Sequence, residues 1–239
     1  MKKTIVFWLA IALSPLSWAT DIRGQIQVMS RDAKQLLASH EHAIIYLSNI
    51  TSKTPKESVS FRQKNKQFQP RLLPVVIGQT VNFKNDDRVQ HNVFSSDKRK
   101  QFDLGRYPNG DSKSVIYDQE GNYKVYCNIH RKMIADIVVV PSIYYAITDE
   151  NGHYVIKNVP KGKYDLKAWH IYGGSEQKKI EIKNEEVTLD MTLVSTKLIR
   201  DLEKHKNKNG NAYKKKSKQD PNRNFDDQYD DTTDMDYFQ

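Results

Sequence analysis

The sequence predicts an all-β protein that contains two β-sandwiches in tandem. Its apolar stretches are short, rich in Val, Ile and Tyr, and separated by turn residues. Long stretches with the 3.6-residue apolar period of a helix are missing, which favours an antiparallel sandwich. Residues 31–40 are the one helical candidate. The strands that we expect in the first sandwich are 22–29, 43–47, 75–83, 92–95, 121–127 and 134–140.

The second sandwich has clearer turns. Asp149-Glu150-Asn151-Gly152 and Pro160-Lys161-Gly162 are sequences typical of tight turns, so we expect hairpins there. After the second turn, Tyr164, Leu166 and Ala168 alternate with polar residues, as in a strand with one buried face. We therefore divide the chain into a first domain at 20–141, a second at 142–195 and a charged tail at 196–239, which we expect to be disordered because it contains few aliphatic residues.

Composition excludes two broad classes of protein. The 239 residues are 38% hydrophobic and 28% charged, which is too polar for a protein with many membrane spans. Thirteen Tyr and eight Phe are too many for a wholly disordered chain. The net charge of +9 is weak evidence for nucleic-acid binding in a chain that the N-terminus predicts to be exported, and we expect no nucleic-acid partner.

The N-terminus predicts export. Lys2 and Lys3 precede an apolar run at 4–13, and Ser17-Trp18-Ala19 resembles a cleavage site, so residues 1–19 read as a signal peptide. The run is too short to span a bilayer, and we expect a periplasmic protein without a membrane span. The chain has a single cysteine, Cys127, which cannot form a disulfide within the chain. Because exported proteins meet an oxidising environment, we expect this unpaired thiol to have a specific role.

One short segment carries the chemistry. Cys127, His130 and Met133 follow one another at intervals of three, between two apolar strands, and Cys127 lies on the apolar face of the first. Upstream, a strand and an acidic turn lead to His91, which a sandwich can bring to the same end. A thiolate, two imidazoles and a thioether are the ligands of a blue-copper centre.

Residues 69–141 resemble a cupredoxin of the plastocyanin/azurin superfamily, and most closely the amicyanins. The resemblance rests on the Cys-x-x-His-x-x-Met loop and on VNFKNDDRVQHNVF upstream of it. It implies one type 1 copper bound by His91, Cys127, His130 and Met133, with His91 buried, His130 at the surface as the electron exit, and Met133 as the axial ligand. It also implies that Asn85 ties the histidine loop to the cysteine loop, with Asn128 as its partner.

Around His130 the sequence departs from the amicyanins. Arg131 and Lys132 stand where amicyanins carry an apolar docking patch, so the rim is basic and we expect a partner with an acidic face. The resemblance implies periplasmic redox partners such as a c-type cytochrome or a dehydrogenase. The segment 21–68 is longer than a minimal cupredoxin needs, and we expect residues 60–68 to be a mobile insertion.

Residues 142–195 are similar to carboxypeptidase-regulatory-like or transthyretin-like modules of the carbohydrate-binding-like fold class. The two-domain arrangement resembles methylamine-utilisation proteins. We therefore expect a non-enzymatic electron carrier, since the further His-x-His and His-Cys-His ligands of multicopper enzymes are missing. Two alternatives remain: a copper-delivery protein without a redox partner, and a sandwich that binds sugar or a partner through residues such as Trp169, His170 and Tyr172.

Overall fold

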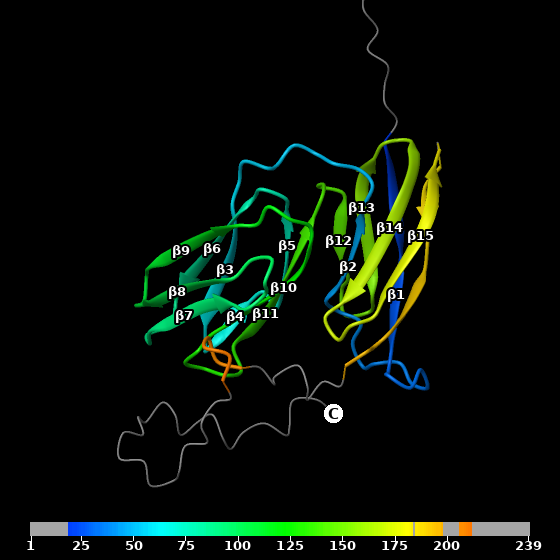
Figure 1. The fold of residues 1–239 in the computed structure, drawn as a ribbon. Coiled ribbons are helices and arrows are strands. Elements are labelled where there is room, and N and C mark those ends of the chain that lie inside the picture. The colour runs from blue at the N-terminus through cyan, green and yellow to red at the C-terminus, as the bar shows by residue number, and fades with distance from the viewer. Residues whose placement is uncertain (1–18, 184, 198–205, 212–239) are drawn as a thin grey trace, which may run out of the picture.

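The described part of the chain forms four stacked β-sheets (Figure 1). The structure, a computed structural model, describes residues 19–183, 185–197 and 206–211. Within these ranges the regular secondary structure is all β-strand, as predicted. No helix long and apolar enough to cross a membrane is found among the described residues. The signal peptide that we expect lies outside the described residues except for Ala19.

The first sandwich, which we call the central sandwich, consists of two sheets built from the strands β3 to β11. One sheet has the order β5-β11-β10-β7-β8 and the other β4-β3-β6-β9. Their apolar faces enclose a core that contains Phe61, Phe83, Tyr123 and Ile137. The strands are β3 (Val59–Lys64), β4 (Gln67–Gln69), β5 (Leu72–Val76), β6 (Thr80–Asn85), β7 (His91–Ser95), β8 (Phe102–Tyr107), β9 (Ser112–Ile116), β10 (Gly121–Tyr126) and β11 (Ile134–Val140).

Two expectations for this sandwich were wrong. The strand expected at 75–83 is two strands, β5 and β6, in opposite sheets, because Gly78 turns the chain with a φ of 82°. Residues 60–68 are not an insertion outside the fold. They form most of the β3–β4 hairpin, and Phe61 and Phe68 bury their rings in the core with their centroids 5.9 Å apart.

The second sandwich, which we call the flanking sandwich, combines the two N-terminal strands, β1 and β2, with the strands β12 to β17. One sheet has the order β13-β1-β16, with β17 also paired to β1, and the other has the order β12-β2-β14-β15. The turns expected at 149–152 and 160–162 are present, but each joins strands of different sheets rather than a hairpin. The strands are β1 (Thr20–Met29), β2 (Ala43–Leu47), β12 (Tyr145–Ile147), β13 (His153–Val159), β14 (Gly162–His170), β15 (Ser175–Ile182), β16 (Val187–Thr188) and β17 (Met191–Val194).

Strand pairing differs from the expected domain boundary at 141. β1 pairs with β13, β16 and β17, and β2 lies between β12 and β14, so the N-terminal strands belong to the flanking sandwich rather than to a domain at 20–141. The physical reason is visible in β2, whose five residues are all buried. Such a strand needs apolar cover on both faces, and only a central position between two layers supplies it.

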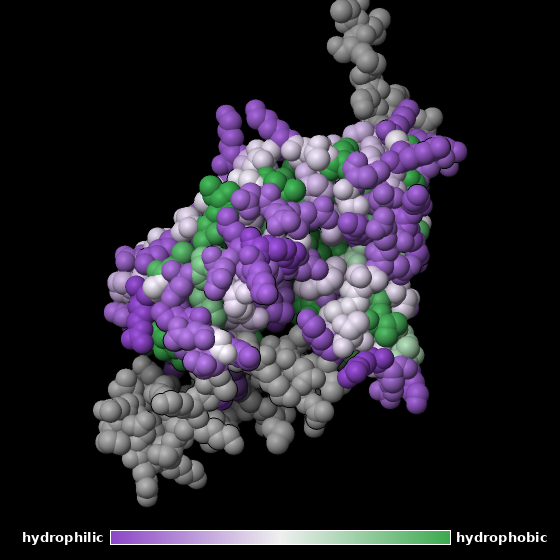
Figure 2. Space-filling view, in the orientation of Figure 1, coloured by the Kyte–Doolittle hydropathy of each residue, from purple (hydrophilic) through white to green (hydrophobic). Residues whose placement is uncertain are grey.

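The two sandwiches pack against each other through these buried strands. Ala43, Ile45 and Leu47 face the core of the flanking sandwich, whereas Ile44 and Tyr46 lie in a cluster with β5 and β11. Beside that cluster the buried carboxylate of Asp136 pairs with Arg71 and with Lys124. The outer surface is largely hydrophilic in the view of Figure 2, because most of the large apolar side chains are buried between the sheets.

Two more expectations concern segments outside the strands. Residues 31–40 form turns and bends rather than a helix, because Ser30 and Asp32 bond to the nearby backbone and compete with helical hydrogen bonds. Most of the tail at 196–239 lies outside the described residues. Of its described residues, Thr196 and Lys197 bond the Tyr172 carbonyl of the flanking sandwich, and 206–211 form a turn that contacts the central sandwich.

Candidate metal centre

Two loops at one end of the central sandwich bring the expected ligands together. His91 is the first residue of β7, and Cys127 directly follows β10. β7 and β10 are neighbours in the sheet, paired at Tyr126 and Phe94, so the two side chains meet where their strands begin and end.

The loop between β10 and β11 is a tight extension of that hairpin. The Cys127 N–H donates to the Met133 carbonyl at 3.1 Å, and the Met133 N–H donates to the His130 carbonyl at 3.0 Å. These two bonds fold the Cys-x-x-His-x-x-Met segment over the end of the sandwich. Cys127 and Met133 are both fully buried in the same core cluster.

The geometry of the three side chains fits a metal ion. The Cys127 sulfur lies 3.9 Å from His91 Nδ1 and 4.0 Å from His130 Nδ1, and the two nitrogens are 3.1 Å apart. Three atoms at these separations share a point about 2 Å from each of them, which is the length of a bond from a first-row metal to nitrogen or thiolate sulfur. All three side chains are buried. The described residues contain no other comparable group of His, Cys, Asp or Glu.

A carboxylate fixes the orientation of His91. Its Nε2 lies 2.7 Å from Asp87 Oδ2, so the ring donates its Nε2–H to Asp87 and turns the Nδ1 lone pair toward Cys127. Burial alone pushes the pKa of Asp87 upward, but bonds from the Lys66 N–H, from His91 and from the Asn65 N–H outweigh it and hold that pKa below its ordinary value. Asp87 is therefore a charged acceptor for the ligand histidine.

Protonation of the ligands is governed by burial. Burial raises the pKa of the Cys127 thiol, so the buried thiolate needs a cation to stabilise it. Burial also lowers the pKa of His91, against the opposing effect of Asp87, and keeps the imidazole neutral and able to coordinate. Metal binding at this site therefore releases the thiol proton of Cys127, whereas His91 is already neutral and needs to lose none.

Asn92 connects the two ligand loops, which corrects the role expected for Asn85. Asn92 Oδ1 accepts the Asn128 N–H at 2.7 Å and lies 3.6 Å from the Cys127 sulfur. The Asn85 side chain instead donates to the carbonyls of Val89 and Tyr107 and accepts the Asp87 N–H, so it shapes the histidine loop. Asn128 does join the loops as expected, but through its backbone and with Asn92 as partner.

The rim of the site is as basic as expected, but His130 is less accessible. Arg131 and Lys132 are exposed beside it. His130 itself is only 8% exposed, which corrects its expected place at the surface. Its ring packs edge-on against the ring of His91, with the centroids 4.8 Å apart.

Sequence reasoning missed Asp87 and Asn92. Both flank His91 in the segment that was compared with the amicyanins, and Asp87 stands four residues before the histidine. A carboxylate close to a candidate ligand is the signal that could have identified it, since ligand histidines usually donate their second nitrogen to such an acceptor.

A family comparison matches the site's part of the chain. The model of copper binding proteins, plastocyanin/azurin family, matches residues 56–140, which include all four expected ligands. These residues form a cupredoxin domain. With the ligand geometry, the match identifies the His91, Cys127, His130 and Met133 cluster as a type 1 copper site.

Several solved structures are similar to part of the chain. They include a purple cupredoxin from Nitrosopumilus maritimus, which is 26% identical over 34% of this chain and 99% of its own, with a TM-score of 0.32. A variant of amicyanin is 19% identical over 36% of this chain and 86% of its own, with a TM-score of 0.34. A copper-containing nitrite reductase from Thermus scotoductus is 22% identical over 39% of this chain and 25% of its own, with a TM-score of 0.34. No curated protein matches the chain.

Proposed function

We propose that the protein is an exported type 1 copper protein that carries single electrons between periplasmic redox proteins. The observation that carries this proposal is the arrangement of one cysteine sulfur and two imidazole nitrogens, all from buried side chains, around a common point. A bound copper ion would supply one-electron chemistry by alternating between Cu(I) and Cu(II).

The residues of the site support one-electron transfer by keeping the copper ligands in fixed positions. Cys127, His91 and His130 would bind the ion, and the Met133 thioether, buried in the same core cluster as Cys127, would be a weaker fourth ligand. Asp87 and Asn92 fix the ligand loops from behind by hydrogen bonds. A site whose ligands are held in this way changes little between oxidation states, and fast electron transfer follows from that rigidity.

A carrier is favoured over a copper enzyme. In the part of the chain that the structure describes, His91, Cys127 and His130 form the only cluster of at least three such ligands. A reductase or oxidase of the multicopper type needs a second, open copper position for its substrate. The buried ligands of the cupredoxin domain leave little access for one.

Export and partners complete the proposal. The signal-like segment at 1–19 supports a periplasmic location. The exposed Arg131 and Lys132 support a redox partner with an acidic docking face, of the kind of a c-type cytochrome or a dehydrogenase.

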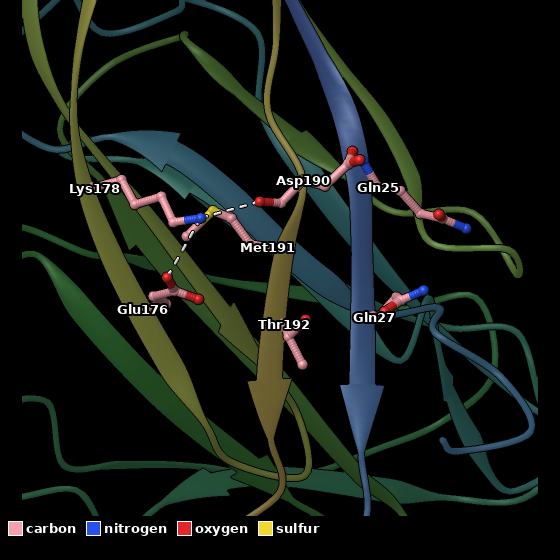
Figure 3. A pocket seen from close by; sticks show the side chains of 7 residues that line it. All are labelled: Gln25, Gln27, Glu176, Lys178, Asp190, Met191 and Thr192. Carbon is pink, nitrogen blue, oxygen red and sulfur yellow. Dashed lines mark hydrogen bonds and ion pairs between the residues drawn. The ribbon is translucent and has the colours of Figure 1, made fainter. Parts of the chain in front are cut away.

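We assign the flanking sandwich, which we compare with carboxypeptidase-regulatory-like modules, a positioning role rather than sugar binding. Trp169 and Tyr172 pack against the apolar cluster between the sandwiches, which supports a role in joining the two sandwiches. A hollow of about 320 Å³ on its surface lacks an aromatic platform, and Lys178 there already bonds the Asp190 carbonyl and pairs with Glu176 (Figure 3). Its lining is Gln25, Gln27, Glu176, Lys178, Asp190, Met191 and Thr192.

The experiment is redox cycling in competition with a chelator. Copper-loaded protein is reduced and reoxidised repeatedly in the presence of a strong Cu(I) chelator, and the copper retained is measured after each cycle. An electron carrier keeps its copper through many cycles. Rapid loss of Cu(I) to the chelator would reject the carrier and favour the delivery protein.

A further inference from the structure

The described part of the C-terminal region is a compact turn that lies against the copper end of the cupredoxin domain. Within the turn, the Asn207 N–H donates to the Asn211 carbonyl at 2.8 Å, and the Asn207 side chain accepts from the backbone of Asn209 and Asn211. Figure 1 shows this turn, in orange, at the lower edge of the central sandwich, below the labels of β7 and β4. It is therefore a folded element in contact with the domain.

Lys208 attaches the turn at two points. Its backbone N–H donates to Asn128 Oδ1 at 3.1 Å, and its ammonium group lies 2.7 Å from Asp103 Oδ2. Asn128 directly follows the ligand Cys127. The turn thus contacts the loop that carries two further ligands, His130 and Met133, from a position 80 residues downstream of that loop.

Both partners of Lys208 lead to Asn92. The side-chain nitrogen Nδ2 of Asn92 lies 3.3 Å from Asp103 Oδ1, the oxygen that Lys208 does not bind. The side-chain oxygen Oδ1 of Asn92 accepts the Asn128 N–H at 2.7 Å. Asn92 is covalently next to His91 and contacts the Cys127 sulfur. Lys208 therefore closes a ring of hydrogen bonds behind both ligand loops.

We propose that the turn at 206–211 caps the copper end of the domain and that Lys208 is a positioning residue for the loop that carries Cys127. The inference rests on the proposed function only in treating this loop as the metal-binding loop. Docked, the cap restrains the opening of the loop and covers part of the face that a redox partner would use. Undocked, it leaves Asp103 and Asn128 accessible to that partner.

The attachment is weak enough to be reversible. The side chains of Lys208 and Asp103 are 42% and 32% exposed, and an ion pair that is this accessible to water contributes little and weakens with salt. The cap can therefore exchange between docked and undocked states. Its positive charge beside the ligand loops also favours Cu(I) over Cu(II) in the docked state.

The test uses Cys127 as its own reporter, because it is the only cysteine of the chain. The full-length protein without metal is treated with iodoacetamide, a neutral reagent, and alkylation is followed by mass spectrometry. Since Cys127 is fully buried, the rate reports local opening of its loop. The variants are Lys208→Glu, which repels Asp103, and Lys208→Arg, which keeps the ion pair. Lys183→Glu is the control, a matched charge reversal on the flanking sandwich, where Lys183 pairs with Glu181.

We expect alkylation of Lys208→Glu to be about fivefold faster than that of the wild type at low salt, with Lys208→Arg and Lys183→Glu near the wild-type rate. Raising the salt from about 0.01 M to about 1 M should speed the wild type toward Lys208→Glu. Equal rates in all four proteins at low salt would overturn the cap. Because no copper is present, that result is independent of whether the protein carries electrons. With copper bound, Lys208→Glu should also have a lower reduction potential than Lys183→Glu, because the docked turn places the charge of Lys208 beside the ligand loops, and equal potentials would show that the turn does not dock there.

Discussion

The two sandwiches each bury histidines, but they use them in opposite ways. In the flanking sandwich, His170 bonds the Glu41 carbonyl through Nε2 at 2.8 Å and accepts the Tyr172 N–H on Nδ1 at 3.2 Å. Both of its nitrogens are occupied by the backbone. In the cupredoxin domain, His91 donates its Nε2–H to Asp87, and its Nδ1 faces the Cys127 sulfur and His130 Nδ1.

The difference shows what makes a buried histidine a metal ligand. Burial is complete for both His91 and His170, so burial does not distinguish them. What distinguishes them is one ring nitrogen that faces other metal-ligating atoms rather than a backbone group. A carboxylate on the opposite nitrogen completes the arrangement, since it sets the tautomer that coordinates.

The largest expected effect comes from substituting each of the two buried histidines and comparing the copper affinities of the variants. His91→Ala should lower copper affinity by more than about 100-fold, because it removes a ligand rather than an outer-shell group. His170→Gln should leave copper affinity within about twofold, since it lies in the other sandwich. Competition with a chelator of known affinity measures both. A large loss of affinity in His170→Gln would break the contrast between the sandwiches.

Acid should destabilise the protein through His170. Burial lowers its pKa to about 4, below the ordinary value of 6.5. The unfolded chain therefore takes up the proton first as the pH falls, so the stability from the neutral ring is complete above pH 6.5 and is lost between pH 6.5 and about 4. The loss should be about 3 kcal/mol in the free energy of unfolding.

Urea unfolding of the metal-free protein at a series of pH values measures this loss. Carboxylates also titrate near the lower end of the range, so the comparison that matters is with His170→Gln, which should show about 3 kcal/mol less dependence on pH. Identical pH dependence in the two proteins would show that the ring is not held neutral.

A smaller effect should follow from removing the charge behind His91. Asp87→Asn should lower copper affinity by about tenfold, because the amide is a weaker acceptor for the Nε2–H. Asp86→Asn is the control, since Asp86 is on the same loop but pairs with Arg62 and Lys84. Chelator competition on both variants measures the difference, and equal affinities would remove Asp87 from the site.

The copper ligands could be predicted from the sequence because three of the four lie within one short loop. Cys127, His130 and Met133 owe their proximity to spacing along the chain, and a single strand pairing adds His91. The β class was equally local, since it depends on the length and alternation of apolar stretches.

What could not be predicted depends on contacts distant in sequence. Whether β1 and β2 join the first or the second sandwich is decided by pairing with strands more than 90 residues away, as in Leu47 with Leu166. Asn92 rather than Asn85 joins the loops because of its place in the register of β7. Lys208 contacts the copper loop from the tail, where neither spacing nor apolar pattern gives a signal.

The visible absorption spectrum of the Cu(II)-loaded protein, recorded beside that of Cys127→Ser, tests the central claim most directly. The substitution keeps a small polar side chain but removes the sulfur whose bond to copper would give intense colour. We expect a strong charge-transfer band in the wild type that a reductant bleaches and an oxidant restores, and none in Cys127→Ser. A colourless wild type, or the same band in both proteins, would contradict a type 1 copper centre at Cys127.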